Sequence, residues 1–111
     1  MSGPLDGKIV SITTGGTATG VPGATAYAGS KSAIEGFSMS LAKELGPRNI
    51  CVNTVMPGAT NTEMFAQAAA QMSPFGRMGQ PGDVADVVVF LCSNEARWIT
   101  GQRLSASGGA V

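Results

Sequence analysis

The residues with the clearest chemical potential are Tyr27 and Lys31, which stand four positions apart in the run Tyr-Ala-Gly-Ser-Lys. At this spacing two side chains lie on one face of a helix, so an ammonium group stands beside a phenol. A phenol ionises near pH ~10, and a neighbouring cation lowers its pKa. The pair is therefore a candidate proton donor or acceptor. The alternative is a solvated helix lysine, because this spacing often arises by chance.

The segments that must position this pair alternate between strand and helix patterns. The sequence predicts strands over 7–13, 50–56 and 102–106, and helices over about 25–45 and 83–93. Such alternation indicates parallel strands joined by right-handed crossovers. We therefore predict a single α/β domain over residues 1–111, with three parallel strands in sequence order. Residues 63–72, rich in Ala and Met, could form a further short helix.

Threonine hydroxyls and glycines also occur where the predicted strands end. The first strand ends in Thr13 and Thr14, followed by Gly15-Gly16, and the second is followed by Pro57-Gly58 and by Thr62. The chain closes with a glycine-rich segment over 99–109. Together with the Tyr-x-x-x-Lys run, this order of parts resembles the short-chain dehydrogenase/reductase family, of the kind that includes the ketoacyl carrier-protein reductases. The resemblance runs from Gly7 onward.

The resemblance implies a catalytic role for three residues. Tyr27 would be the general acid–base residue in hydride transfer between NAD or NADP and a carbonyl or alcohol. Lys31 would lower the Tyr27 pKa and hydrogen-bond the ribose of the nicotinamide half. Thr14 stands thirteen residues before Tyr27, where the family has a serine that holds the substrate oxygen. Threonine keeps the hydroxyl, but its methyl group restricts the rotamer and crowds the pocket.

The second strand and the segment after it match the cofactor side of the family's site. Pro57, Gly58 and Thr62 match the residues that touch the nicotinamide carboxamide, and ligands bind at the carboxyl ends of parallel strands. The alternative for Pro57-Gly58 is an ordinary turn. Asn53 matches a position with a structural role, and strand alternation turns Thr13 towards the core.

The family's variable substrate loop corresponds to an apolar stretch of this chain. Its large apolar residues are Met64, Phe65, Met72, Phe75 and Met78. They could form a lid over a hydrophobic substrate, a piece of local core, or a dimer contact. Ser107 stands where the family has a structural aspartate, so we expect a weaker local hydrogen bond there.

Two motifs of the family do not occur in the sequence. These are Thr-Gly-x-x-x-Gly-x-Gly and Asn-Asn-Ala-Gly, which belong to the half that holds the adenine dinucleotide. The resemblance therefore predicts a partial Rossmann-like, doubly wound fold that is inactive as a lone chain. The alternatives are a non-catalytic, self-associating fragment and a module that binds a small ligand on the nicotinamide side.

Composition excludes several classes of protein. Seven basic and seven acidic residues give a net charge of zero, which provides no field for nucleic acid or anionic lipid. No apolar run reaches the ~20 residues of a membrane span, and no signal peptide is evident. The chain has no histidine, which excludes zinc sites and triads built on histidine, and we predict no metal site. Cys51 and Cys92 are expected to be reduced, small hydrophobic residues in a cytoplasmic protein.

Two surfaces predict self-association, most simply as a homodimer. The strand at Lys8–Thr13 lacks the outer neighbour that the family provides, and an exposed apolar edge invites pairing. The long helix has a face of small residues, namely Ala28, Ser32, Gly36 and Ser40. The resemblance slightly favours this helix face, because the family uses the equivalent helix between subunits. The alternative is that the small residues let the helix pack closely on its own sheet.

Overall fold

The chain alternates strands and helices through residues 7–58 and 71–111, the part that this computed structural model describes. The strands are β1 (Lys8–Ile12), β2 (Cys51–Pro57) and β3 (Arg103–Ala106), and the helices are α1 (Gly16–Thr19), α2 (Thr25–Leu45) and α4 (Pro81–Leu91). Single 3₁₀ turns follow α2 at Gly46–Arg48 and α4 at Asn94–Ala96. The predicted strands and long helices are confirmed, with boundaries that differ by no more than two residues.

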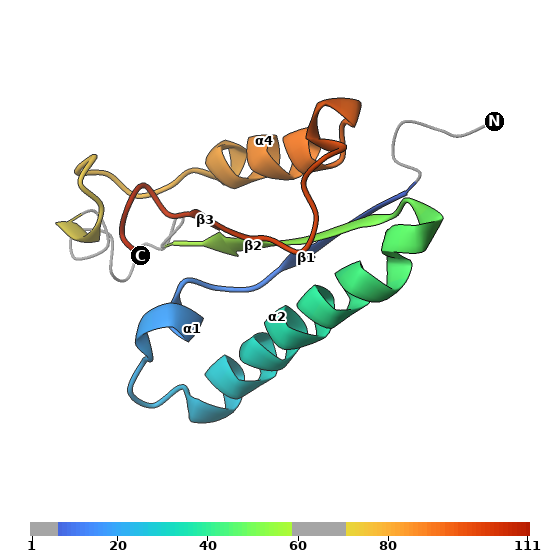
Figure 1. The fold of residues 1–111 in the computed structure, drawn as a ribbon. Coiled ribbons are helices and arrows are strands. Elements are labelled where there is room, and N and C mark those ends of the chain that lie inside the picture. The colour runs from blue at the N-terminus through green and yellow to red at the C-terminus, as the bar shows by residue number, and fades with distance from the viewer. Residues whose placement is uncertain (1–6, 59–70) are drawn as a thin grey trace.

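The three strands form one parallel sheet in the order β1-β2-β3, as predicted. The register pairs Lys8 with Cys51 and Thr54 with Arg103. The sheet is the middle of three layers, because α1 and α2 lie on one face and α4 lies on the other (Figure 1). All carboxyl ends of the strands therefore meet at one edge of the sheet.

The two crossovers have opposite hands, which corrects the expectation that both are right-handed. Both connections advance in the same direction across the sheet, yet α2 and α4 cover opposite faces (Figure 1). Two right-handed crossovers in one direction would place both helices on the same face. The connection between β2 and α4 spans 58–80, which gives the chain room to reach the other face.

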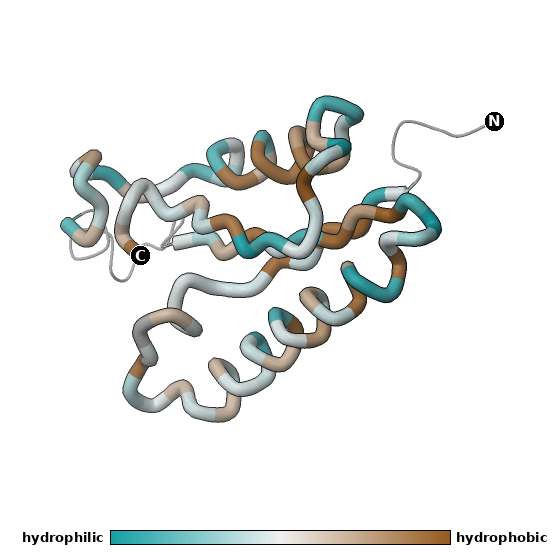
Figure 2. Tube along the Cα trace, in the orientation of Figure 1, coloured by the Kyte–Doolittle hydropathy of each residue, from teal (hydrophilic) through white to brown (hydrophobic). Residues whose placement is uncertain are grey.

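The hydrophobic core lies mainly between the sheet and α4. Its buried centre consists of Val55, Leu91 and Ala96, and partly buried side chains of β1, α4 and β3 pack around it. Figure 2 shows hydrophobic residues concentrated on the strands and α4, whereas α2 has a mixed character. The sheet is thus held by apolar packing on one face and by smaller, more polar contacts on the other.

The face of α2 that packs on the sheet is not the face of small residues. Its buried residues are Glu35, Ser38 and Ala42, and the Ser38 hydroxyl lies 3.2 Å from that of Ser11 in β1. Gly36 and Ser40 are exposed. Both residues line an open pocket that reaches Thr100 and Gly101, and no atom lies within 4 Å of a Cβ built on Gly36. This part of the small-residue face therefore does not pack closely on the sheet, contrary to the alternative interpretation.

Two buried polar residues, Asn53 and Thr13, test predictions made for the strands. The Asn53 side chain donates to the Ile99 carbonyl at 2.9 Å and accepts from the Gln102 amide at 3.1 Å. It thereby ties β2 to the segment that leads into β3, which confirms its predicted structural role. Thr13 is buried, also as predicted, and its hydroxyl has no hydrogen-bond partner among the described residues.

The β1 edge and the outer face of α2 leave apolar side chains exposed. Within the described residues β1 pairs with β2 alone, and Ile9 and Ile12 are 39% and 43% exposed. Phe37 of α2 is 66% exposed. None of the helices in the described part of the chain is long and apolar enough to span a bilayer.

Candidate active site

The ends of β1 and β2 meet at the carboxyl edge of the sheet. The Gly15 amide donates to the Pro57 carbonyl at 3.0 Å, which continues the strand pairing past β1. A pocket of about 230 Å³ opens there. Its lining residues are Thr14, Gly15, Gly16, Val21, Pro57, Gly58, Met72, Ala110 and Val111. Three of the predicted site residues, Thr14, Pro57 and Gly58, are therefore brought together.

Thr14 stands at the turn from β1 into α1, a one-turn helix that the sequence analysis did not predict. Its hydroxyl accepts from the Gly16 amide at 3.3 Å, and its carbonyl accepts from the Thr17 amide at 3.4 Å. The Gly20 amide adds a further bond to the Gly16 carbonyl at 2.8 Å, which closes the single turn. These local bonds hold Thr14 half-buried at the pocket, with its hydroxyl hydrogen free to donate.

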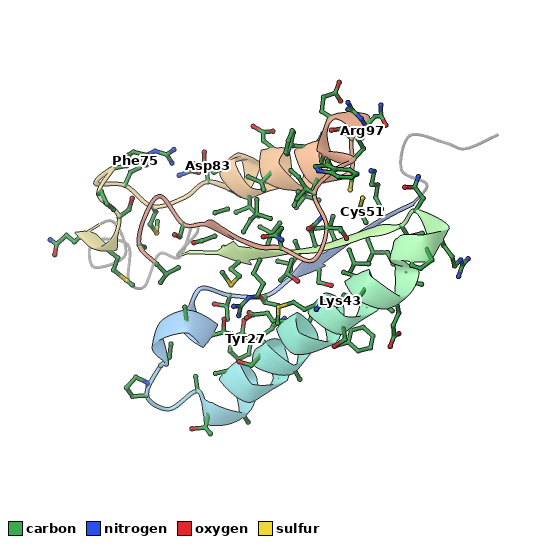
Figure 3. All side chains as sticks on the ribbon, in the orientation of Figure 1. Tyr27, Lys43, Cys51, Phe75, Asp83 and Arg97 are labelled. Carbon is green, nitrogen blue, oxygen red and sulfur yellow. The ribbon has the colours of Figure 1, made fainter. Side chains whose placement is uncertain are left out.

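Tyr27 and Lys31 lie near the start of α2, on one face, as their spacing predicts. The Lys31 ammonium stands 5.7 Å from the centroid of the Tyr27 ring, within the range of a cation–π contact. Lys31 is half-buried, whereas Tyr27 is 55% exposed. Figure 3 places Tyr27 on the half of α2 that runs beside α1. Neither residue lines the pocket that contains Thr14, so the described residues form two neighbouring parts of a site.

Glu35 is a polar residue of this region that the sequence analysis missed. It follows Lys31 by one helical turn and is 3% exposed. Its carboxylate accepts from the Thr17 hydroxyl at 2.7 Å and from the Arg103 guanidinium at 3.4 Å. The repeat of polar residues at 27, 31 and 35, on a face that must meet the sheet, is the signal that could have found it.

The carboxyl terminus closes the pocket by a near contact with the end of β2. A Cβ atom on Gly58 would lie 2.8 Å from the Ser107 Cβ, closer than real Cβ atoms approach, and 3.0 Å from the Ser107 Cα. The Ser107 hydroxyl lies 2.8 Å from that of Ser105 and 3.3 Å from the Val111 amide. A glycine is therefore required at 58 for the end of β2 to pass this turn.

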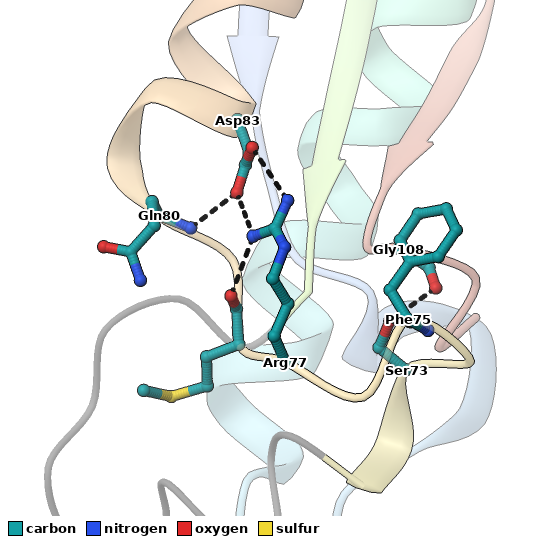
Figure 4. A network of polar contacts seen from close by, with 7 residues as sticks. Ser73, Phe75, Arg77, Gln80, Asp83 and Gly108 are labelled. Carbon is teal, nitrogen blue, oxygen red and sulfur yellow. Dashed lines mark hydrogen bonds and ion pairs between the residues drawn. The ribbon is translucent and has the colours of Figure 1, made fainter.

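An exposed polar network holds the segment that precedes α4 (Figure 4). Arg77 donates to both carboxylate oxygens of Asp83, at 2.7 and 3.2 Å, and the Gln80 amide donates to the same carboxylate at 2.7 Å. Arg77 first, and then the Gln80 amide, lower the pKa of Asp83 to about 2. The Ser73 hydroxyl also donates to the Gly108 carbonyl at 2.6 Å. Segment 71–80 is thus fixed beside the carboxyl terminus.

The predicted substrate loop is described only in part. Met72 lines the pocket beside Thr14 and is 60% exposed, and Phe75 is 75% exposed. Thr62, the fourth predicted cofactor residue, lies outside the described residues, as do Met64 and Phe65. The expected short helix over 63–72 also falls largely outside them, although residues 71 and 72 are helical. The lid, core and dimer-contact interpretations of this stretch remain open.

A family model described as Enoyl-(Acyl carrier protein) reductase matches residues 1–111. With this match over the whole sequence, the chain belongs to the short-chain dehydrogenase/reductase family, as its motifs predicted. Among curated proteins, the 3-oxoacyl-[acyl-carrier-protein] reductase FabG of Aquifex aeolicus (strain VF5) is 44% identical over 110 residues. That match covers 93% of this chain and 44% of that protein. The Uncharacterized oxidoreductase YjdA of Bacillus subtilis (strain 168) is 40% identical over 111 residues, covering 96% and 44%.

Solved structures give the same fold. The promiscuous reductase LugOII, which catalyses keto-reduction at C1 during lugdunomycin biosynthesis, superposes with a TM-score of 0.89 at 44% identity. The angucycline C-6 ketoreductase LanV with bound NADP has a TM-score of 0.89 at 38% identity. These matches cover 96% of this chain and 45% and 44% of those chains. The chain therefore spans less than half the length of the relatives it matches.

Proposed function

We propose that the chain carries the acid–base side of an NAD(P)-dependent oxidoreductase that interconverts a carbonyl and an alcohol. The observation that supports this most directly is the shared location of the groups. Thr14, Pro57 and Gly58 line one pocket at the carboxyl edge, and Tyr27 and Lys31 lie on the adjoining half of α2. The names of the relatives, which include ketoreductases and a structure with bound NADP, point to the same chemistry.

The residues present fit the nicotinamide end of such a cofactor and not the whole molecule. The pocket of about 230 Å³ is smaller than the ~300–1,000 Å³ of sites that enclose drug-sized ligands. Gly58, whose position excludes a side chain, leaves backbone open to a flat ring. Pro57, Gly58 and Thr62 would contact the carboxamide, and Lys31 the ribose. The cofactor supplies the hydride, and this chain supplies the proton.

In this proposal Tyr27 gives its phenolic proton to the carbonyl oxygen as the carbonyl carbon accepts hydride. The Thr14 hydroxyl donates a hydrogen bond to the same oxygen and stabilises the charge that develops there. Lys31 stabilises the phenolate that remains until solvent returns a proton. In the direction of alcohol oxidation the same groups act in reverse.

The lone chain would not turn over substrate, because most of the binding energy for the dinucleotide comes from groups that it lacks. Without them the nicotinamide is not held next to Tyr27, and an orientation effect worth ~7–11 kcal/mol is lost. The missing contacts belong to the part of the relatives that this chain does not match.

Complementation tests the proposal. The chain would be mixed with a polypeptide comprising the part of the Aquifex FabG relative that it does not match, and oxidation of NADPH and NADH would be followed with a 3-oxoacyl thioester. We expect turnover only in the mixture, and its loss with Tyr27→Phe. Lys31→Met should lower it strongly, whereas Lys43→Met, on the same helix but far from the site, should not. Turnover that persists with Tyr27→Phe would refute the proposal, and a folded, inactive mixture would favour a non-catalytic chain.

We also propose that the chain is a cytoplasmic homodimer that pairs through the outer face of α2. Exposed Gly36 and Ser40 would allow two helices to approach closely, and exposed Phe37 would be covered. The β1 edge, which pairs with no further strand among the described residues and has Ile9 and Ile12 exposed, is the competing surface. Cys51 and Cys92 are both free, which suits a reducing compartment.

A further inference from the structure

Glu35 is the one charged side chain that is buried among the described residues, at 3% exposure. A carboxylate in such a place is costly unless it is paired and hydrogen-bonded. Here it accepts from the Thr17 hydroxyl at 2.7 Å and from the half-exposed guanidinium of Arg103 at 3.4 Å. One carboxylate therefore joins α2 to α1 on one side and to β3 on the other.

The bond to Thr17 reaches Thr14 within one turn. The Thr17 amide donates to the Thr14 carbonyl at 3.4 Å, and the Thr17 hydroxyl lies 3.0 Å from the same carbonyl. This hydroxyl has one hydrogen, and the shorter, charge-assisted bond to Glu35 is the stronger one. Glu35 thus holds the Thr17 side chain, and Thr17 holds the turn that presents Thr14.

Glu35 also stands on the helix face of the acid–base pair. Tyr27, Lys31 and Glu35 follow one another at intervals of one turn, and α2 is continuous from Thr25 to Leu45. A rigid helix transmits the position of Glu35 to Tyr27. The contact between Glu35 and Thr17 therefore links the turn that carries Thr14 to the helix that carries Tyr27.

We propose that Glu35 is a positioning residue, which through Thr17 fixes α1 and Thr14 at the distance from Tyr27 that lets both hydroxyls reach one substrate oxygen. This role rests on the proposed function. A displacement of ~1 Å between such groups can lower a rate about 100-fold. Arg103 provides the countercharge that keeps the carboxylate in place, and within the described part of the chain it hydrogen-bonds to neither Thr14 nor Tyr27.

A spectroscopic test uses the fact that Tyr27 is the one tyrosine in the sequence. The chain would be labelled with 3-fluorotyrosine, so that a single ¹⁹F resonance reports on Tyr27. Thr17→Val removes the hydroxyl at nearly constant shape, and Glu35→Met removes the carboxylate. We expect each to move the resonance by more than its linewidth, and the double variant to move it no further. Thr17→Ser, which keeps the hydroxyl, and Glu44→Gln, on an exposed turn of the same helix, should leave it in place.

Far-ultraviolet circular dichroism monitors whether each variant folds, because the signal of the helices does not depend on Tyr27. If Glu35→Met does not fold, Thr17→Val and Thr17→Ser decide the question. An unmoved ¹⁹F resonance in folded Thr17→Val, or shifts that add in the double variant, would overturn the proposal.

A second readout uses the complemented enzyme. Thr17→Val should lower kcat about 100-fold while the cofactor KM stays unchanged, because the change affects the alignment of substrate oxygen and not cofactor contacts. An unchanged kcat would overturn the positioning role. If the complemented wild type shows no turnover at all, the proposed function fails, and the ¹⁹F comparison still decides whether Glu35 positions Thr14 relative to Tyr27.

Discussion

The exposed ion pair between Arg77 and Asp83 fixes the path of the chain into α4. Both side chains are exposed, and an isolated surface ion pair contributes little to stability. This one is bidentate, and the same carboxylate also accepts from the amide at the start of α4. It therefore fixes the direction in which the chain leaves the carboxyl edge and enters α4.

The lowered pKa of Asp83 predicts a pH dependence of stability. The folded pKa is about 2 and the ordinary value is 3.8, so the ionised carboxylate stabilises the fold above about pH 4. That contribution is lost as pH falls from about 4 towards 2. The difference in melting temperature between wild type and Asp83→Asn should be present at pH 6 and should shrink over that window. Asp86→Asn is the control, because Asp86 makes no ion pair with a described residue. A difference that does not change with pH would contradict this account.

Gly58 gives a residue-scale prediction about packing. An alanine Cβ there would meet the Ser107 Cβ at 2.8 Å, and a backbone shift is the only relief. Gly58→Ala should lower the free energy of unfolding by ~1–3 kcal/mol. Gly82→Ala, in α4 with no atom near its added Cβ, should raise it slightly or leave it unchanged. Chemical denaturation followed by far-ultraviolet circular dichroism measures both, and equal effects of the two substitutions would be evidence against the close approach.

At the scale of elements, Asn53 connects the centre of the sheet to the entry into β3. Asn53→Val would leave the Ile99 carbonyl and the Gln102 amide without their partner. Each such group left unpaired costs ~1–3 kcal/mol, so the free energy of unfolding should fall by about 2–6 kcal/mol. Asn94→Ala, at an exposed position, should change it by less than ~0.5 kcal/mol. An Asn53→Val protein as stable as wild type would show that this side chain does not hold the two segments together.

The elements that the sequence predicted well are those with strong local signals. Gly46-Pro47 is a stop signal, and α2 indeed ends at Leu45. The one-turn helix α1 was missed because it depends on bonds to the Thr14 and Gly15 carbonyls, for which threonine and glycine give no propensity signal. The hand of the crossovers was missed as well, because a long connection can leave the sheet on either face.

In the candidate site, too, the sequence predicted the contacts that have a local signal and missed those that depend on the tertiary fold. The Tyr27–Lys31 contact and the meeting of Thr14 with Pro57 follow from helix spacing and from strand ends, which sequence reveals directly. Glu35 was not predicted, because its role depends on Thr17 and on Arg103, which lies 68 residues away in sequence. Contacts of this range are set by the tertiary fold.

At the scale of the whole molecule, the proposed dimer leads to a prediction about Gly36. A long, charged side chain on the outer face of α2 would prevent two helices from approaching, whereas it leaves the β1 edge untouched. Gly36→Arg should therefore convert a dimer to a monomer in light scattering at micromolar concentration. Gly82→Arg, an equally exposed glycine on α4, should not. A Gly36→Arg protein that remains dimeric would point to pairing through the β1 edge, and a monomeric wild type would refute self-association.

The central claim is that this chain supplies the acid–base residues and depends on other groups to hold the cofactor. The most direct measurement is a steady-state assay of the 111-residue chain alone, with NADH and NADPH and a panel of aldehydes and ketones. We predict no turnover above background, because contacts to the nicotinamide end alone are too few to hold the cofactor beside Tyr27. Turnover by the lone chain that disappears with Tyr27→Phe would contradict the account, because these residues would then form a complete active site.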